Sequence, residues 1–153
     1  MNTFLSYLHT VNATLAMVFG AFIFFNIKGT RWHKVLGYGY VVSMALLNIS
    51  AMFIYDLFGD FGPFHAAALA SFITLVAGYI PAYRRKPNKG WIPLHYYLMS
   101  WCYAGLLAAA ASEALTRLPS APFTPAVIAA SLGVFMVSGW LIHRRDPFEL
   151  IKR

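Results

Sequence analysis

Five long apolar stretches, separated by short polar segments, dominate the pattern of the chain. They cover about Phe4–Asn26, Lys34–Leu57, Phe64–Tyr83, Trp91–Leu115 and Pro125–Ile142. Each stretch is long enough for an α-helix to cross the hydrocarbon core of a bilayer, which takes about 20 residues. Because the connections are short, we expect consecutive helices to be antiparallel neighbours whose backbone groups are satisfied within each helix. The pattern predicts an all-α integral membrane protein, with five transmembrane helices in one bundle that forms a single domain over residues 1–153.

The composition agrees with a membrane protein. Hydrophobic residues make up 59% of the chain and charged residues only 11%, which is unlike a soluble globular domain. The net charge of +7 would suit nucleic acid, but the basic residues lie in short connections and in the tail, so we expect no nucleic-acid partner. The single cysteine, Cys102, excludes an intrachain disulfide and is expected to be a packing residue inside the fourth span.

The basic residues predict the orientation of the bundle. Eleven of the 12 lysines and arginines fall in the first connection, the third connection and the C-terminal tail, and only Arg117 falls on the other side. By the positive-inside rule these three segments are cytoplasmic. We therefore expect the N-terminus outside and the C-terminus in the cytoplasm, with the lipid bilayer as the main partner.

All five histidines lie within about two turns of the end of a span, His9 and His65 at the predicted outer side and His33, His95 and His143 at the inner side. Histidines that face the interior of a membrane bundle are functional candidates, because burying them without a partner is costly. Alternate helices of an antiparallel bundle can face each other diagonally. The pairs His9 with His65 and His33 with His95 could then each hold a b-type haem through two axial imidazoles, which would serve electron transfer.

A second hypothesis uses only the outer side. His9, Asp56, His65 and Glu113 come from four different spans at similar predicted depth, and two imidazoles with carboxylates can bind zinc or a similar divalent ion. Such a site would serve metal handling or hydrolysis. Alternatively Arg117, one turn after Glu113, pairs with that carboxylate and removes it as a ligand.

Two further hypotheses remain open. Asp56, His65 and Glu113 could act as relays of an ion or proton pathway, and the polar residues could instead only seal and orient the helices of an accessory membrane subunit. The chain contains no HExxH, paired-cysteine or glycine-rich phosphate motif that would select among these functions.

Local motifs carry a resemblance to a known family. The segments are KGTRWHKVLGYGYVVSMALLNISA, FGPFHAAALASFITLVAGY and RRKPNKGWIPLHYYLMSWCYAGLLAAAASEALTR. They resemble an uncharacterised bacterial family of small multi-span membrane proteins, a domain of unknown function. Its members share a basic-His-x-x-x-Gly span opening, a later His followed by Met and Tyr, and an Arg that closes that span; here these are His33 with Gly37, His95 with Met99 and Tyr103, and Arg117. The resemblance implies a multi-span helical protein and no established activity.

The layout of histidines at both ends of the bundle is also similar, at the level of architecture, to cytochrome b561-type haem proteins. We therefore rank haem-linked electron transfer above a non-haem divalent site and above an accessory role. We expect a multi-pass protein of a bacterial cytoplasmic (inner) membrane, whose partners besides the bilayer are a membrane redox partner or a second copy of the chain.

Overall fold

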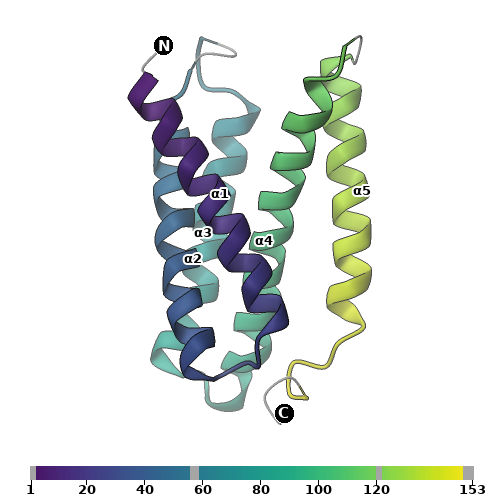
Figure 1. The fold of residues 1–153 in the computed structure, drawn as a ribbon. Coiled ribbons are helices and arrows are strands. Elements are labelled where there is room, and N and C mark those ends of the chain that lie inside the picture. The colour runs from purple at the N-terminus through teal and green to yellow at the C-terminus, as the bar shows by residue number, and fades with distance from the viewer. Residues whose placement is uncertain (1–2, 56–58, 120–121, 150–153) are drawn as a thin grey trace.

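The computed structural model describes residues 3–55, 59–119 and 122–149. These residues form α1 (Thr3–Phe25), α2 (Arg31–Ala51), α3 (Pro63–Arg84), a short 3₁₀ turn η1 (Asn88–Gly90), α4 (Trp91–Thr116) and α5 (Phe123–His143), with no strand among them (Figure 1). All five α-helices are long and apolar enough to cross a membrane. The predicted all-α fold with five spans is confirmed.

The helix boundaries match the predicted spans closely except in α2. This helix begins three residues earlier than expected, because the Thr30 hydroxyl accepts the His33 amide at 3.2 Å and caps its first turn. It ends at Ala51 rather than Leu57, since the next three amides donate to carbonyls only three residues back and tighten the chain into a turn. Hydropathy alone did not predict this end, because the residues after Ala51 remain apolar although they leave the helix.

The helices form a four-helix group with a fifth helix at its side. Helix α2 packs between α1 and α3, α3 packs against α4, and α1 touches α4 only weakly. Helix α5 packs mainly against α4, with one further ring contact between its Phe123 and Phe64 of α3, whose centroids are 6.2 Å apart. The two ends of the chain lie at opposite ends of the bundle (Figure 1). Helices α2 and α4 therefore lie across the bundle from each other, as do α1 and α3.

Tyr103 of α4 connects three helices in the core. Its hydroxyl donates to the Met17 carbonyl of α1 at 3.1 Å, and a Cβ at Gly20 would overlap its ring. The ring also lies 5.3 Å from that of Phe24 and 6.1 Å from that of Tyr40 in α2. The absence of a side chain at Gly20 thus lets an aromatic ring fill the space where α1 crosses α4.

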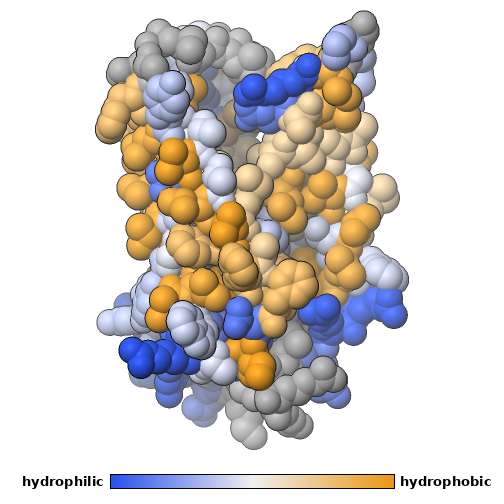
Figure 2. Space-filling view, in the orientation of Figure 1, coloured by the Kyte–Doolittle hydropathy of each residue, from blue (hydrophilic) through white to orange (hydrophobic). Residues whose placement is uncertain are grey.

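The surface has an apolar band with a basic end. Figure 2 shows hydrophobic side chains over the middle of the bundle and strongly hydrophilic ones gathered at the end where the C-terminus lies. The exposed basic residues of that end are Arg31, Lys34, Arg84, Arg85, Lys86, Arg144 and Arg145. Among the described residues, only Arg117 is basic at the opposite end. This asymmetry is the one on which the predicted orientation depends.

Candidate functional site

The structure brings His33 and His95 together at the basic end of the bundle. His33 lies in the first turn of α2 and His95 lies one turn into α4. Their ring centroids are 6.4 Å apart and the ring planes are nearly perpendicular, at 88°. Because α2 and α4 do not pack directly against each other, the two imidazoles meet across the bundle. The predicted proximity of this pair agrees with the structure.

A backbone carbonyl fixes the orientation of His95. Its Nδ1 lies 2.9 Å from the carbonyl oxygen of Gly78 in α3, and a carbonyl can only accept, so Nδ1 carries the proton and donates. In the neutral ring the lone pair is then on Nε2. Metal-binding histidines are held in the same way, with the second ring nitrogen donating to a carbonyl or carboxylate. The hydrogen bond to Gly78 therefore leaves Nε2 of His95 with its lone pair available as an acceptor.

Gly78 makes this hydrogen bond possible by letting α4 come close to α3. A Cβ at this position would lie 2.9 Å from the Met99 sulfur and 3.1 Å from the Leu98 Cβ. These distances are too short for ordinary packing. A small residue such as Gly78 lets two membrane helices approach each other closely. Its role as the acceptor for His95 depends on how α3 and α4 pack.

His33 has a buried nitrogen that no protein group satisfies. Its Nδ1 is buried and has no hydrogen-bond partner in the structure, a state that costs free energy unless another molecule supplies the partner. One turn further along α2, no heavy atom lies within 4 Å of the place a Cβ would take at Gly37. The surroundings of His33 thus combine an available nitrogen with open space beside it.

Lys28 lies at the same end of the bundle, between α1 and α2. Its ammonium group donates to the carbonyls of Ile23, Phe24 and Asn26 and so closes the last turn of α1. Burial, and secondarily the positive charge of Arg145, lower the pKa of Lys28 below its usual value. Lys28 is therefore engaged in holding the end of α1.

At the opposite end, a hydroxyl fixes the tautomer of His9. Its Nδ1 lies 3.1 Å from the Ser50 hydroxyl of α2, and that hydroxyl donates to the Leu47 carbonyl at 2.8 Å. The hydroxyl oxygen therefore accepts from His9 Nδ1, which leaves the lone pair on Nε2. The Glu113 carboxylate of α4 is close enough to interact with this imidazole electrostatically.

His65 has the reverse arrangement. Its Nδ1 accepts the Gly62 amide at 3.1 Å and so caps the start of α3. In the neutral ring the proton is then on Nε2, which is buried and has no hydrogen-bond partner. The ring is stacked against Tyr55 and Phe61, with centroids 4.6 and 5.3 Å away. In this tautomer His65 can donate a hydrogen bond but cannot bind a metal through Nε2.

Helices α1 and α3 do not pack directly against each other, and the pairing of His9 with His65 stays a prediction. Asp56 lies outside the described residues, which contain no group of three or more His, Cys, Asp and Glu side chains arranged to hold a metal ion. The zinc hypothesis at this end stays a prediction.

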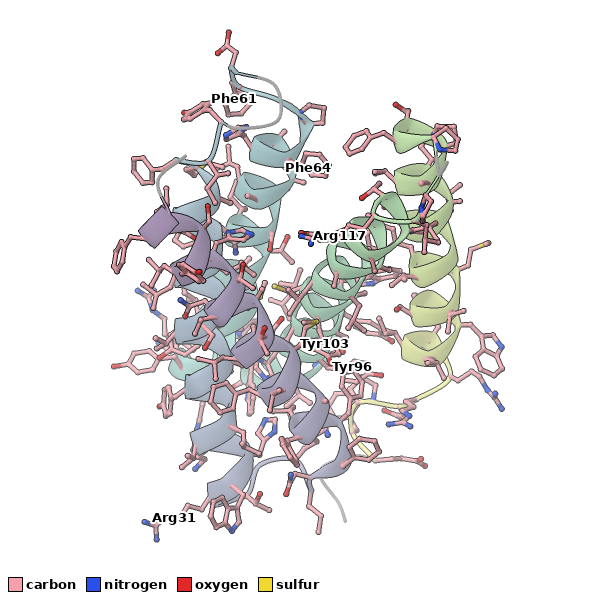
Figure 3. The ribbon with its side chains drawn as sticks, turned by 45° about the horizontal axis from the view of Figure 1, so that its top comes forward. Arg31, Phe61, Phe64, Tyr96, Tyr103 and Arg117 are labelled. Carbon is pink, nitrogen blue, oxygen red and sulfur yellow. The ribbon has the colours of Figure 1, made fainter. Side chains whose placement is uncertain are left out.

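Glu113 and Arg117 form an ion pair with each other. The Arg117 guanidinium lies 2.5 Å from the Glu113 carboxylate, four residues earlier on α4. The side chains are 76% and 63% exposed, respectively, and Figure 3 shows Arg117 directed from α4 toward the gap that separates it from α1 and α3. Of the two alternatives drawn from the sequence, the structure has the ion pair.

His143 lies at the end of α5. Its Nδ1 donates to the Gly139 carbonyl of the same helix at 2.8 Å, and its exposed ring approaches the rings of Tyr97 and Trp101. These contacts join the end of α5 to α4. They are typical of an aromatic anchor at the membrane surface.

Two buried polar groups were not singled out from the sequence. The Asn48 side-chain nitrogen on α2 is buried without a hydrogen-bond partner, and the buried Tyr40 hydroxyl on the same helix lies beside the Cys102 thiol of α4. They share the buried side of α2 with His33, since positions 33, 40 and 48 are separated by about two helical turns each. A polar residue every two turns within an apolar span is the signal that could have identified them.

The chain was compared with known proteins. No curated protein and no solved structure matches it. The model of one family, described as "Predicted membrane protein (DUF2306)", matches residues 6–144, which include all five histidines and most of each span. This chain is therefore a member of the DUF2306 family of membrane proteins.

Proposed function

We propose that this chain is a membrane redox protein that binds one b-type haem between His33 and His95. One observation carries the proposal: two imidazoles from diagonally opposed helices lie with their ring centroids 6.4 Å apart, and a carbonyl holds one of them in the tautomer that leaves Nε2 able to bind a metal. Pairs of axial histidines on facing helices are a common way to hold haem within a helical bundle.

The distance between the two rings supports this assignment. Two imidazoles on opposite sides of one metal ion have centroids roughly 6 Å apart, since each metal–nitrogen bond is about 2 Å and each nitrogen lies about 1 Å from its ring centre. The observed separation is 6.4 Å. A tetrahedral site would bring the rings nearer to each other, so the distance supports a group that His33 and His95 would hold from its two sides.

The neighbouring residues support a macrocycle rather than a bare ion. The open space beside Gly37 lies one turn from His33, where the edge of a flat ring would need room. Lys34 is exposed next to His33 and acts electrostatically on its imidazole, so its charge can pair with the carboxylates that haem carries. A b-type haem with two imidazole ligands transfers single electrons without exchanging those ligands.

The proposal is limited to one haem. At the other end, His9 has a free Nε2, but His65 uses its Nδ1 as the cap of α3 and keeps its proton on Nε2. A second haem or a divalent ion there would require His65 to change tautomer and to give up the Gly62 amide. The inner pair needs no such rearrangement.

The proposal includes an orientation and a partner. The basic end would face the cytoplasm of a bacterial cell, which places the haem near the inner surface of the membrane. One electron carrier in this position requires a redox partner that reaches the same depth, in the bilayer or at its inner face.

The test is the absorption spectrum of the purified protein. Cells are supplied with a haem precursor and the protein is isolated in detergent; we expect a Soret band and the low-spin spectrum of an iron with two imidazole ligands. His33→Ala and His95→Ala should each lose the band. His143→Ala and His65→Ala are matched controls, because both remove an imidazole outside the pair, and both should keep it.

Bound metals are measured in the same preparations. Colourless protein from cells with ample haem precursor would refute the proposal. If zinc or copper is bound in place of haem and is lost in His95→Ala, the histidine pair binds that smaller ion and the haem assignment is wrong. Loss of haem in His65→Ala but not in His95→Ala would show that the ligands are at the other end.

A further inference from the structure

A cavity lies on the other side of α4 from the histidine pair. It has a volume of about 220 Å³ and lies where α1, α4 and α5 meet at the basic end of the bundle. Helix α5 packs mainly against α4, and its backbone does not approach that of α1. Helix α4 is therefore the back wall of a groove whose two sides are α1 and α5. Figure 3 shows Tyr96 and Tyr103 of α4 in this region, beside α1.

The cavity has a polar end and an apolar end. Arg145, which follows α5, and Tyr96, in the second turn of α4, lie at the level of the membrane surface, whereas Leu107 lies deeper in the bundle. The Tyr96 hydroxyl donates to the Ile142 carbonyl at 3.0 Å, which ties this end of α4 to the end of α5. Arg145 thus supplies a positive charge at the opening of an otherwise largely apolar groove.

The length of the groove matches one leaflet of a bilayer. The lining residues of α4 run from Tyr96 to Leu107, which is about 16 Å at the rise of 1.5 Å per residue of an α-helix. Half of the hydrocarbon core is about 15 Å thick. The groove therefore extends from the headgroup level to the middle of the membrane.

We infer that this groove is a binding site for an anionic phospholipid, with its phosphate at Arg145 and one acyl chain along α4 between α1 and α5. Charge complementarity selects the occupant, because a positive side chain at the headgroup level attracts anionic lipids. The aromatic rings of Phe24 and Tyr103 form the wall against which the chain packs. Neither His33 nor His95 lines this cavity, so the lipid site shares no lining residue with the proposed haem site.

The test measures lipid binding by native mass spectrometry. Delipidated protein is titrated with phosphatidylglycerol and, separately, with phosphatidylcholine carrying the same two oleoyl chains. We expect tighter binding of phosphatidylglycerol, and Arg145→Gln should reduce this affinity about fivefold, the effect of one basic residue near an anionic surface. The affinity for phosphatidylcholine should stay within a factor of about two, since the tail contacts are intact.

The neighbouring arginine provides a matched control. Arg144 stacks on Trp140, with its guanidinium 4.2 Å from the ring centroid, and it does not line the cavity. Arg144→Gln removes the same charge one residue away and should leave the preference for phosphatidylglycerol in place. Ser138→Leu, which fills the cavity from α5, should weaken both lipids by the same factor.

Three results would overturn the inference. Equal losses in Arg144→Gln and Arg145→Gln would mean that the tail attracts lipid only through its overall charge. Equal affinity of the unchanged protein for both lipids would show that Arg145 does not select an anionic headgroup. Full binding in Ser138→Leu would show that the acyl chain lies elsewhere on the surface.

Discussion

Gly78→Ala tests the close approach of α3 and α4 on which the histidine site depends. The added Cβ would lie 2.9 Å from the Met99 sulfur and 3.1 Å from the Leu98 Cβ. The methionine side chain can move, but the Leu98 Cβ is fixed to the backbone of α4, so the helices must separate. Overpacking of this kind costs about 1–3 kcal/mol.

A matched substitution separates this clash from the change in helix propensity. Replacing glycine by alanine inside a helix stabilises it by about 0.5–1 kcal/mol, and this gain is common to both variants. At Gly105, on α4, nothing lies within 4 Å of the added Cβ. The stability difference between Gly78→Ala and Gly105→Ala is therefore the clash itself, about 1–3 kcal/mol.

The assay uses the single cysteine of the chain. Cys102 is only 3% exposed, so a thiol-reactive fluorescent maleimide labels it when the bundle unfolds in detergent. We expect Gly78→Ala to melt below Gly105→Ala by at least about 3 °C, since 1 kcal/mol corresponds to roughly 2–4 °C for a chain of this size. Haem content should fall in Gly78→Ala alone, because His95 moves away from its acceptor. Equal melting temperatures would refute the packing of α3 on α4 described above.

Three further predictions concern other parts of the bundle. Tyr103→Phe removes the hydrogen bond from α4 to α1 and should lower stability by about 0.5–1.5 kcal/mol, measured by the same maleimide assay; an unchanged melting temperature would contradict that bond. Because the pKa of Lys28 is lowered in the folded state, the unfolded chain holds its proton to higher pH, and stability should rise as the pH approaches 10.5. Lys28→Gln should show a smaller rise, and identical pH profiles would refute the assignment. In a Cys102→Ala background, Leu118→Cys should react with a membrane-impermeant maleimide on intact cells and Asn88→Cys only after lysis, and the reverse pattern would invert the orientation.

Hydropathy predicted the spans because the length of an apolar run is nearly all that a bilayer requires of a helix. It could not predict that α2 ends at Ala51, since the change there is in hydrogen bonding while the residues remain apolar. The cap at Thr30 could have been predicted from the sequence. A threonine just before a helix can accept the amide of the residue three positions later, and this is a known helix start signal.

The histidine site was predictable only in part. Depth and the alternation of helices suggested both His33 with His95 and His9 with His65, but depth says nothing about the direction in which each side chain points around its helix. The tautomers could not be predicted from the sequence either, since the partner of His95 is a carbonyl that the packing at Gly78 brings near. His65, which caps α3, comes three residues after Gly62 and two after the proline at the start of the helix. This local pattern could have been recognised in the sequence.

Helix α4 is shared by the two proposed sites, and this has a thermodynamic consequence. One side of α4 carries His95 and the other side carries Tyr96 and the proposed lipid groove, and α5 packs mainly against α4. A ligand that shifts α4 changes the distance between the imidazoles, so lipid occupancy and cofactor affinity are linked and each must alter the other by the same factor. The lipid composition of the leaflet at the basic end would then alter cofactor affinity at the histidine pair, although the lipid contacts neither histidine.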